Sequence, residues 1–155
     1  MNRFICFALF LLLSLPACSS LPNNQPASPS PAPAPLLKII MTGGLCPYGG
    51  CSVELDIDSD GAFTVREGGA LMQQGVTDKA RISQLIEYVN KANFNTIKAQ
   101  PFIEICPAAY DGSEMTYTFH TSHGVETISS CEVVIDDHQP LFQLANTLWQ
   151  EILSK

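Results

Sequence analysis

Short stretches of alternating apolar and polar residues mark much of the chain beyond residue 36. Residues 53–58 read V-E-L-D-I-D and residues 62–66 read A-F-T-V-R, which is the period of two expected of a strand with one buried face. Between them stands Asp60-Gly61, a pair typical of tight turns. The pattern therefore predicts a hairpin.

Two other stretches repeat their apolar residues every three or four positions. The first carries, on one face of a helix, Ile82, Leu85, Ile86 and Val89. Thr77 or Asp78 can serve as its N-cap. The second is expected to begin at Asp136 or Asp137, with Pro140 in its first turn. Its inward residues are Leu141, Leu144, Leu148, Trp149 and Ile152.

The order of these elements predicts the fold class. Further strands are expected over 37–41, 70–74, 115–121 and 125–130, the last two joined around Ser122-His123-Gly124. Strands, helix, strands and helix in this order indicate an α+β fold, with an antiparallel sheet of about five to six strands packed against two helices. We expect residues 36–155 to form this single domain, a length sufficient for one modest core.

The beginning of the chain has another character. After the positive start Met1-Asn2-Arg3, residues 4–15 are apolar except for Ser14. Twelve residues of helix rise about 18 Å, too little for a hydrocarbon core of about 30 Å. The run is instead typical of a signal peptide, residues 1–17.

Leu15-Pro16-Ala17-Cys18 resembles the lipobox of bacterial lipoproteins. The resemblance implies cleavage before Cys18, diacylglycerol on its sulfur, and acylation of the new amine with a chain such as palmitate. Several acyl chains anchor a protein durably at a membrane. The protein is then expected in the cell envelope, and Ser19 is similar to an outer-membrane sorting signal if the cell is Gram-negative.

Residues 18–35 are expected to form a linker behind the lipid. Six of the eleven prolines lie between Pro22 and Pro35, in a stretch without charge. Such a composition cannot bury enough apolar surface to fold, and it favours extended polyproline II. At about 3.1 Å per residue the linker can hold the domain up to roughly 50 Å from the lipid.

The charge excludes two classes of partner. The formal net charge is -7, and loss of the leader also removes Arg3. The remaining lysines and arginines are scattered, whereas nucleic-acid binding and adhesion to anionic lipid need them clustered. We therefore expect no nucleic-acid partner, and membrane contact through the lipid on Cys18 alone.

Four cysteines remain for the domain: Cys46, Cys51, Cys106 and Cys131. An exported compartment favours disulfides, and four cysteines allow three connectivities. We favour Cys46–Cys51, which encloses the turn-like residues 47–50, and Cys106–Cys131. A zinc site and a redox-active Cys46/Cys51 pair are the alternatives, although neither has the C-x-x-C spacing usual for such sites.

The segment T-G-G-L-C-P-Y-G-G-C-S-V-E-L-D-I-D-S-D-G-A-F, residues 42–63, resembles the opening of an uncharacterised domain found in bacterial secreted proteins and lipoproteins. The resemblance implies strands followed by two helices and an exported location. It implies no activity, because that domain has none assigned.

One acidic motif suggests a metal. Asp56, Asp58, Asp60 and Glu67 fit the calcium-loop pattern D-x-D-x-D-G-x5-E, with Gly61 at the sharp turn. A calcium loop of this type needs flanking helices, whereas the surrounding pattern predicts strands. Acids on the solvent face of a hairpin are thus the favoured interpretation, and calcium binding is the alternative.

These observations favour a non-enzymatic binding or structural module held at the membrane by its lipid, with an envelope protein as a possible partner. We expect no cofactor. Two other hypotheses remain open: an inhibitor of a secreted protease or other hydrolase, acting through the loop 47–50, and an enzyme whose site forms only in the fold.

We predict that a Cys18→Ser variant loses its lipid, since the thioether forms on that sulfur. After detergent phase separation it should move from the detergent phase to the aqueous phase, with a Cys6→Ser variant as the control. Equal partitioning of Cys18→Ser and the parent would contradict the lipid anchor.

Overall fold

The computed structural model describes residues 34–44 and 51–154. The predicted signal peptide, Cys18, most of the predicted linker, Cys46 and the loop 47–50 lie outside the described residues.

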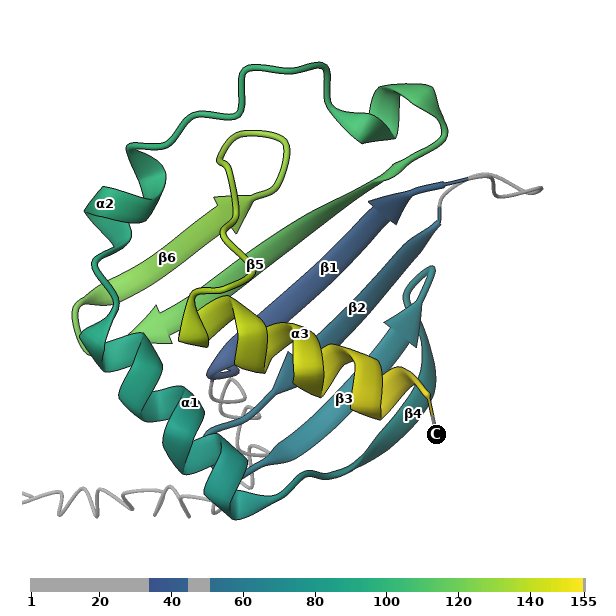
Figure 1. The fold of residues 1–155 in the computed structure, drawn as a ribbon. Coiled ribbons are helices and arrows are strands. Elements are labelled where there is room, and N and C mark those ends of the chain that lie inside the picture. The colour runs from purple at the N-terminus through teal and green to yellow at the C-terminus, as the bar shows by residue number, and fades with distance from the viewer. Residues whose placement is uncertain (1–33, 45–50, 155) are drawn as a thin grey trace, which may run out of the picture. The chain divides into compact units, whose positions relative to one another are not determined.

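Within the described ranges the chain forms a six-stranded antiparallel sheet in the order β4-β3-β2-β1-β5-β6 (Figure 1). The strands are β1 (Leu37–Gly43), β2 (Ser52–Ile57), β3 (Ala62–Glu67), β4 (Ala70–Val76), β5 (Ser113–Thr121) and β6 (Gly124–Ser129). The first strand in sequence lies inside the sheet, where it pairs with both β2 and β5. The predicted antiparallel α+β arrangement is confirmed.

Two long helices, α1 (Lys79–Lys91) and α3 (Pro140–Leu153), lie on the same face of this sheet (Figure 1). The connection between α1 and β5 contains the short helix α2 (Phe94–Lys98) and the 3-10 helix η1 (Pro107–Tyr110). In the part of the chain described, no helix combines the length and the apolar character needed to cross a membrane.

The core lies between the sheet and these helices because side chains alternate along each strand. On β1, Leu37 and Ile39 are fully buried, while Lys38 points to the other face. Ile39 pairs with Leu55 of β2, and Leu37 pairs with Phe119 of β5. Both partners are also fully buried. The strand register therefore assigns one face of the sheet to the core.

The other face of the sheet carries a charge cluster. The Lys38 ammonium lies 2.8 Å from Glu54 Oε1 and 3.2 Å from Asp56 Oδ1, and Arg66 Nη1 lies 2.8 Å from Asp56 Oδ2. Partial burial works against the charge of Lys38, but its hydrogen bonds to Glu54 and Asp56 outweigh it and raise the pKa of Lys38. The hydrogen bond from Lys38 lowers the pKa of Glu54.

Of the two predicted helix starts, one is confirmed and the other is wrong. Asp78 is confirmed as the N-cap of α1, where its carboxylate accepts from the Ala80 N–H at 2.8 Å. The predicted start of the last helix at Asp136 or Asp137 is wrong, because α3 begins at Pro140 with Gln139 as N-cap. Asp136 instead closes a turn, since its carboxylate accepts from the His138 N–H at 2.9 Å.

Candidate functional site

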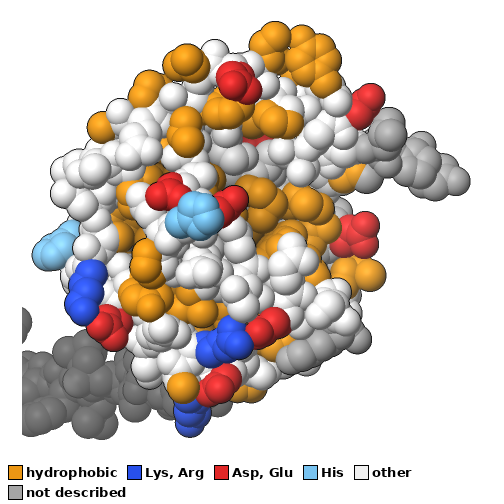
Figure 2. All heavy atoms as spheres, viewed as in Figure 1, with side chains coloured by type: hydrophobic (Ala, Val, Ile, Leu, Met, Phe, Trp, Pro, Cys, Tyr) orange, Lys and Arg blue, Asp and Glu red, His pale blue; other side chains and the backbone are white. Residues whose placement is uncertain are grey.

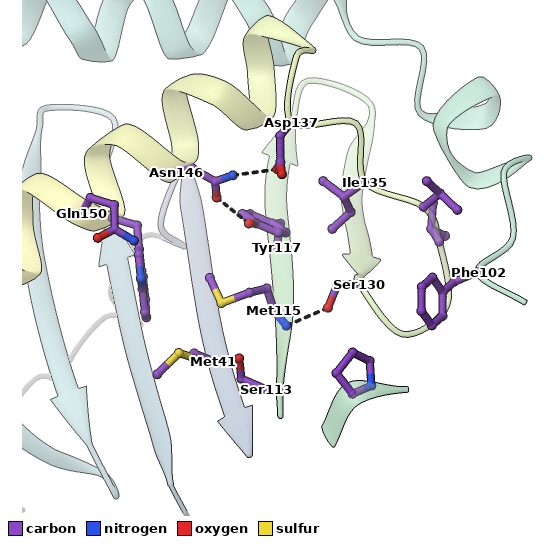
Figure 3. Close-up of a pocket in the computed structure, with 14 residues that line it drawn as sticks. Met41, Phe102, Ser113, Met115, Tyr117, Ser130, Ile135, Asp137, Asn146 and Gln150 are labelled. Carbon is purple, nitrogen blue, oxygen red and sulfur yellow. Dashed lines mark hydrogen bonds between the residues drawn. The ribbon is translucent and has the colours of Figure 1, made fainter. Parts of the chain in front are cut away.

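A cleft of about 630 Å³ lies between the end of the sheet at β1 and β5, helix α3, and the chain that follows β6 (Figure 3). Most of its wall is apolar. The lining includes Met41, Phe102, Met115, Val133, Ile135 and Trp149. Its volume falls within the range of about 300–1,000 Å³ typical of small-molecule sites, and such sites are also mostly apolar.

Three residues that line this cleft are linked by two hydrogen bonds. The Tyr117 hydroxyl donates to Asn146 Oδ1 at 2.5 Å, and Asn146 Nδ2 donates to Asp137 Oδ1 at 3.1 Å (Figure 3). β5, α3 and the segment between β6 and α3 supply one residue each. Because both ends of the Asn146 amide are engaged, its orientation is fixed.

The environment of Tyr117 keeps its hydroxyl protonated. Burial, together with the negative charge of Asp137, raises the pKa of Tyr117 to about 12, and the hydrogen bond to Asn146 opposes this rise only in part. Tyr117 therefore acts as a hydrogen-bond donor at neutral pH. The Tyr117 hydroxyl and the Asp137 carboxylate thus join the other polar side chains of a mostly apolar cleft, which are Ser113, Ser130, Asn146 and Gln150.

A disulfide and a β-bridge hold the loop on one side of the cleft. Cys106 and Cys131 are joined, with their Cα atoms 5.0 Å apart. Pro101 pairs with Val133 in the bridge, where the Phe102 N–H donates to the Glu132 carbonyl at 2.9 Å. The predicted Cys106–Cys131 disulfide is thus present, and it ties the loop 101–106 to the segment that follows β6.

The loop also displays apolar side chains to solvent. Ile103 is 90% exposed and Ile105 64%, and Tyr110 at the end of the following helix η1 is 69% exposed. Figure 2 shows hydrophobic side chains gathered over the connection between α2 and β5, at the top of the view. The tied loop therefore presents an apolar surface.

The other predicted pair falls partly outside the described residues. Cys51 is disulfide-bonded, and its predicted partner Cys46 lies outside, as does the loop 47–50. Zinc binding through Cys51 is contradicted, because a sulfur in a disulfide is not a thiolate. Redox chemistry at Cys46 and Cys51 stays an alternative hypothesis.

The four acids of the candidate calcium loop are spread along a hairpin. Asp56 points to the open face of β2 and binds Arg66 and Lys38. Asp60 caps the β2–β3 turn, where its carboxylate accepts from the Ala62 N–H at 2.9 Å. Glu67 stands at the far end of β3, five residues beyond Ala62 and so about 16 Å from the turn. The structure does not bring the four together, and we propose no calcium site here.

One group of potential metal ligands does occur among the described residues, formed by Cys106, Glu114 and Cys131 within 4.8 Å of one another. The two sulfur atoms are bonded to each other and are not thiolates, which are the form that binds metals. Glu114 accepts a hydrogen bond from the Ser129 hydroxyl. The group is therefore a structural brace.

The hydrophobic pattern of the sequence does not indicate the cleft. Trp149, predicted as a core residue, is buried as expected and also lines the cleft. Asp137, predicted as a helix start, lines the cleft instead. The sequence contains one local indication of the cleft. Two acids, Asp136 and Asp137, precede Pro140, whereas a helix needs only one capping residue.

A comparison of the chain with protein-family models and with curated protein sequences finds no match. The resemblance to an uncharacterised exported domain therefore stays a prediction.

We predict that Tyr117 makes stability depend on alkaline pH. Its pKa is raised from 10.0 to about 12 on folding, so its contribution is fully present below pH 10 and is lost as the pH rises towards 12. The thermal unfolding midpoint, measured between pH 9 and pH 11.5, should fall more steeply for the parent than for Tyr117→Phe. Tyr110→Phe, at an exposed site, is the control and should follow the parent. Parallel curves for the parent and Tyr117→Phe would contradict the prediction.

Proposed function

We propose that this protein is a non-enzymatic, lipid-anchored binding module of the bacterial envelope and that the cleft beside Tyr117 is its binding site. The observation that carries the proposal is the combination of a large apolar cleft with a fixed hydrogen-bond chain on its wall. Ligand sites commonly combine an apolar lining with a few polar groups in this way. The lipobox at Leu15–Cys18 supports the anchor.

The lining indicates the chemical class of the ligand. Among the described lining residues Asp137 alone is charged. Its Oδ1 accepts from Asn146, and a carboxylate can accept further hydrogen bonds. A ligand with an apolar body and a neutral or positively charged head group is therefore favoured over one with a carboxylate head.

The single tryptophan of the chain gives a direct measurement, because Trp149 lines the cleft. Dodecylamine, dodecanol and dodecanoate share one apolar body and differ in their heads. We predict that the amine and the alcohol change Trp149 fluorescence at concentrations below micelle formation. The carboxylate should bind about tenfold more weakly, which corresponds to about 1.4 kcal/mol of repulsion at a few ångströms.

Asp137→Asn should remove this preference for the head group. Asp111→Asn is the matched control, since Asp111 lies outside the lining and has a φ of 64°, a conformation that asparagine adopts readily. Equal binding of all three probes to the parent would contradict the assigned ligand class, and binding of none would contradict the cleft as an apolar site.

A specific observation favours inhibition of a secreted hydrolase as the second candidate. The loop 102–105 is fixed at one end by the Pro101–Val133 bridge and at the other by the Cys106–Cys131 disulfide. Between these ties Ile103 is almost fully exposed. A loop held in one conformation loses little entropy when it enters the cleft of a protease. This loop is thus a second candidate inhibitory segment beside residues 47–50, which lie outside the described residues.

For this candidate we predict inhibition of an elastase-type serine endopeptidase, which accepts small aliphatic side chains. The full chain should slow peptide hydrolysis in proportion to its concentration, and Ile103→Asp should abolish the effect. Val125→Asp, at another exposed apolar residue, should retain it. Rapid cleavage at Ile103 without inhibition would identify the loop as a substrate and reject this function.

A further inference from the structure

β4 is an edge strand of the sheet, and its composition is unusual for an edge strand. β4 reads A-L-M-Q-Q-G-V and contains no charged residue. Leu71, Met72 and Val76 on this strand are 55%, 62% and 69% exposed. Edge strands usually carry charges that prevent pairing with other chains. The opposite edge strand, β6, does carry one, Glu126, which binds Lys98 at 2.7 Å.

The backbone of β4 determines which groups face outward. The Thr77 N–H donates to the Gly61 carbonyl at 2.9 Å, toward β3. Backbone groups of successive residues in a strand point to opposite sides. Gly75 and Gln73 therefore bond toward β3, while Gln74 and Val76 direct their N–H and C=O groups to the free edge.

The side chains of β4 alternate in the same way between the two faces of the sheet. Val76 pairs with Ala62 and Gln74 with Thr64, whose side chains lie on the face away from the helices. The register between β3 and β4 shifts beside Val65 and Arg66, so that Met72 is the extra residue. Counted back from Gln74, Met72 lies on that same open face.

We propose that β4 is a dimerisation edge that pairs antiparallel with β4 of a second copy of this chain, around a twofold axis at Gln74. In this register Gln74 exchanges two backbone hydrogen bonds with Gln74 of the partner subunit. Met72 then lies opposite Val76 of the partner subunit, and Val76 opposite its Met72. Each pair joins two exposed apolar side chains on the same face, so the strand complements itself, as a twofold interface requires.

The composition of β4 also bears on its occupant. The chain has a net charge of -7, and the uncharged β4 strand adds none of that charge to a contact between two copies. An antiparallel arrangement brings the end of β4 that follows Glu67 beside the end that precedes Asp78 and Lys79 of the partner subunit. The contact therefore rests on the backbone hydrogen bonds and the apolar pairs, not on charge.

The test is site-specific crosslinking of the purified full chain in mild detergent. A Gln74→Cys variant places two thiols across the axis, where paired Cα atoms lie about 5.5 Å apart, a separation that a disulfide spans. Val125→Cys, exposed on the other edge strand, is the control. Mild oxidation should crosslink Gln74→Cys at least about tenfold faster, because pairing raises the local thiol concentration.

A second change tests the apolar pairs. Adding Val76→Lys to Gln74→Cys places a charge opposite Met72 of the partner subunit and should return crosslinking to the control rate. Val76 is mostly exposed, so the variant should keep the unfolding midpoint of the parent. Equal crosslinking of Gln74→Cys and Val125→Cys would overturn the proposal, and so would a rate that Val76→Lys leaves unchanged.

Discussion

The pairing of β1 on both of its edges is the constraint on which the other parts of this fold depend. Leu37 and Ile39 are fully buried only because β2 and β5 bring Ile57 and Leu55 on one side, and Phe119 and Tyr117 on the other, into register beside them. A slip of one residue would turn Lys38 into the core. The charge cluster of Lys38 with Glu54 and Asp56 on the open face opposes that slip.

The same register produces the cleft. Met41 pairs with Met115 on the core side of the sheet, one step beyond the buried pair Ile39 and Tyr117. At that step the two methionines line the cleft with Trp149 of α3. The cleft is thus a continuation of the hydrophobic core to the surface. Tyr117 belongs to both, since its ring is buried and its hydroxyl faces Asn146.

The elements of the fold could be predicted because each has a local pattern. Alternation identified the strands, and the spacing of Ile82, Leu85 and Val89 identified α1. The five residues of α2 are too few to show a helical period. The start of α3 was misplaced because Asp136 can cap a turn as readily as a helix.

The candidate site could not be predicted in the same way. Its lining comes from β1, the loop before β5, β5 itself, the segment after β6 and α3. No spacing in the sequence relates these segments, since the sheet order alone brings them together. The Cys106–Cys131 pair was the one long-range contact that residue type predicted, because cysteines usually form disulfides in exported proteins, the class that the N-terminal sequence predicts. The acids from Asp56 to Glu67 are the opposite case. Their spacing fits a calcium loop, but the backbone that carries them is a hairpin.

The position of β1 has a mechanical consequence. The residues before Leu36 lead directly into this strand, which lies inside the sheet. A force applied through them acts on a strand that is paired on both edges. Pulling β1 out requires breaking its ladders to β2 and to β5 at once, whereas an edge strand would separate from one neighbour. If the chain is held by its N-terminal side, the domain resists tension through two ladders, not one.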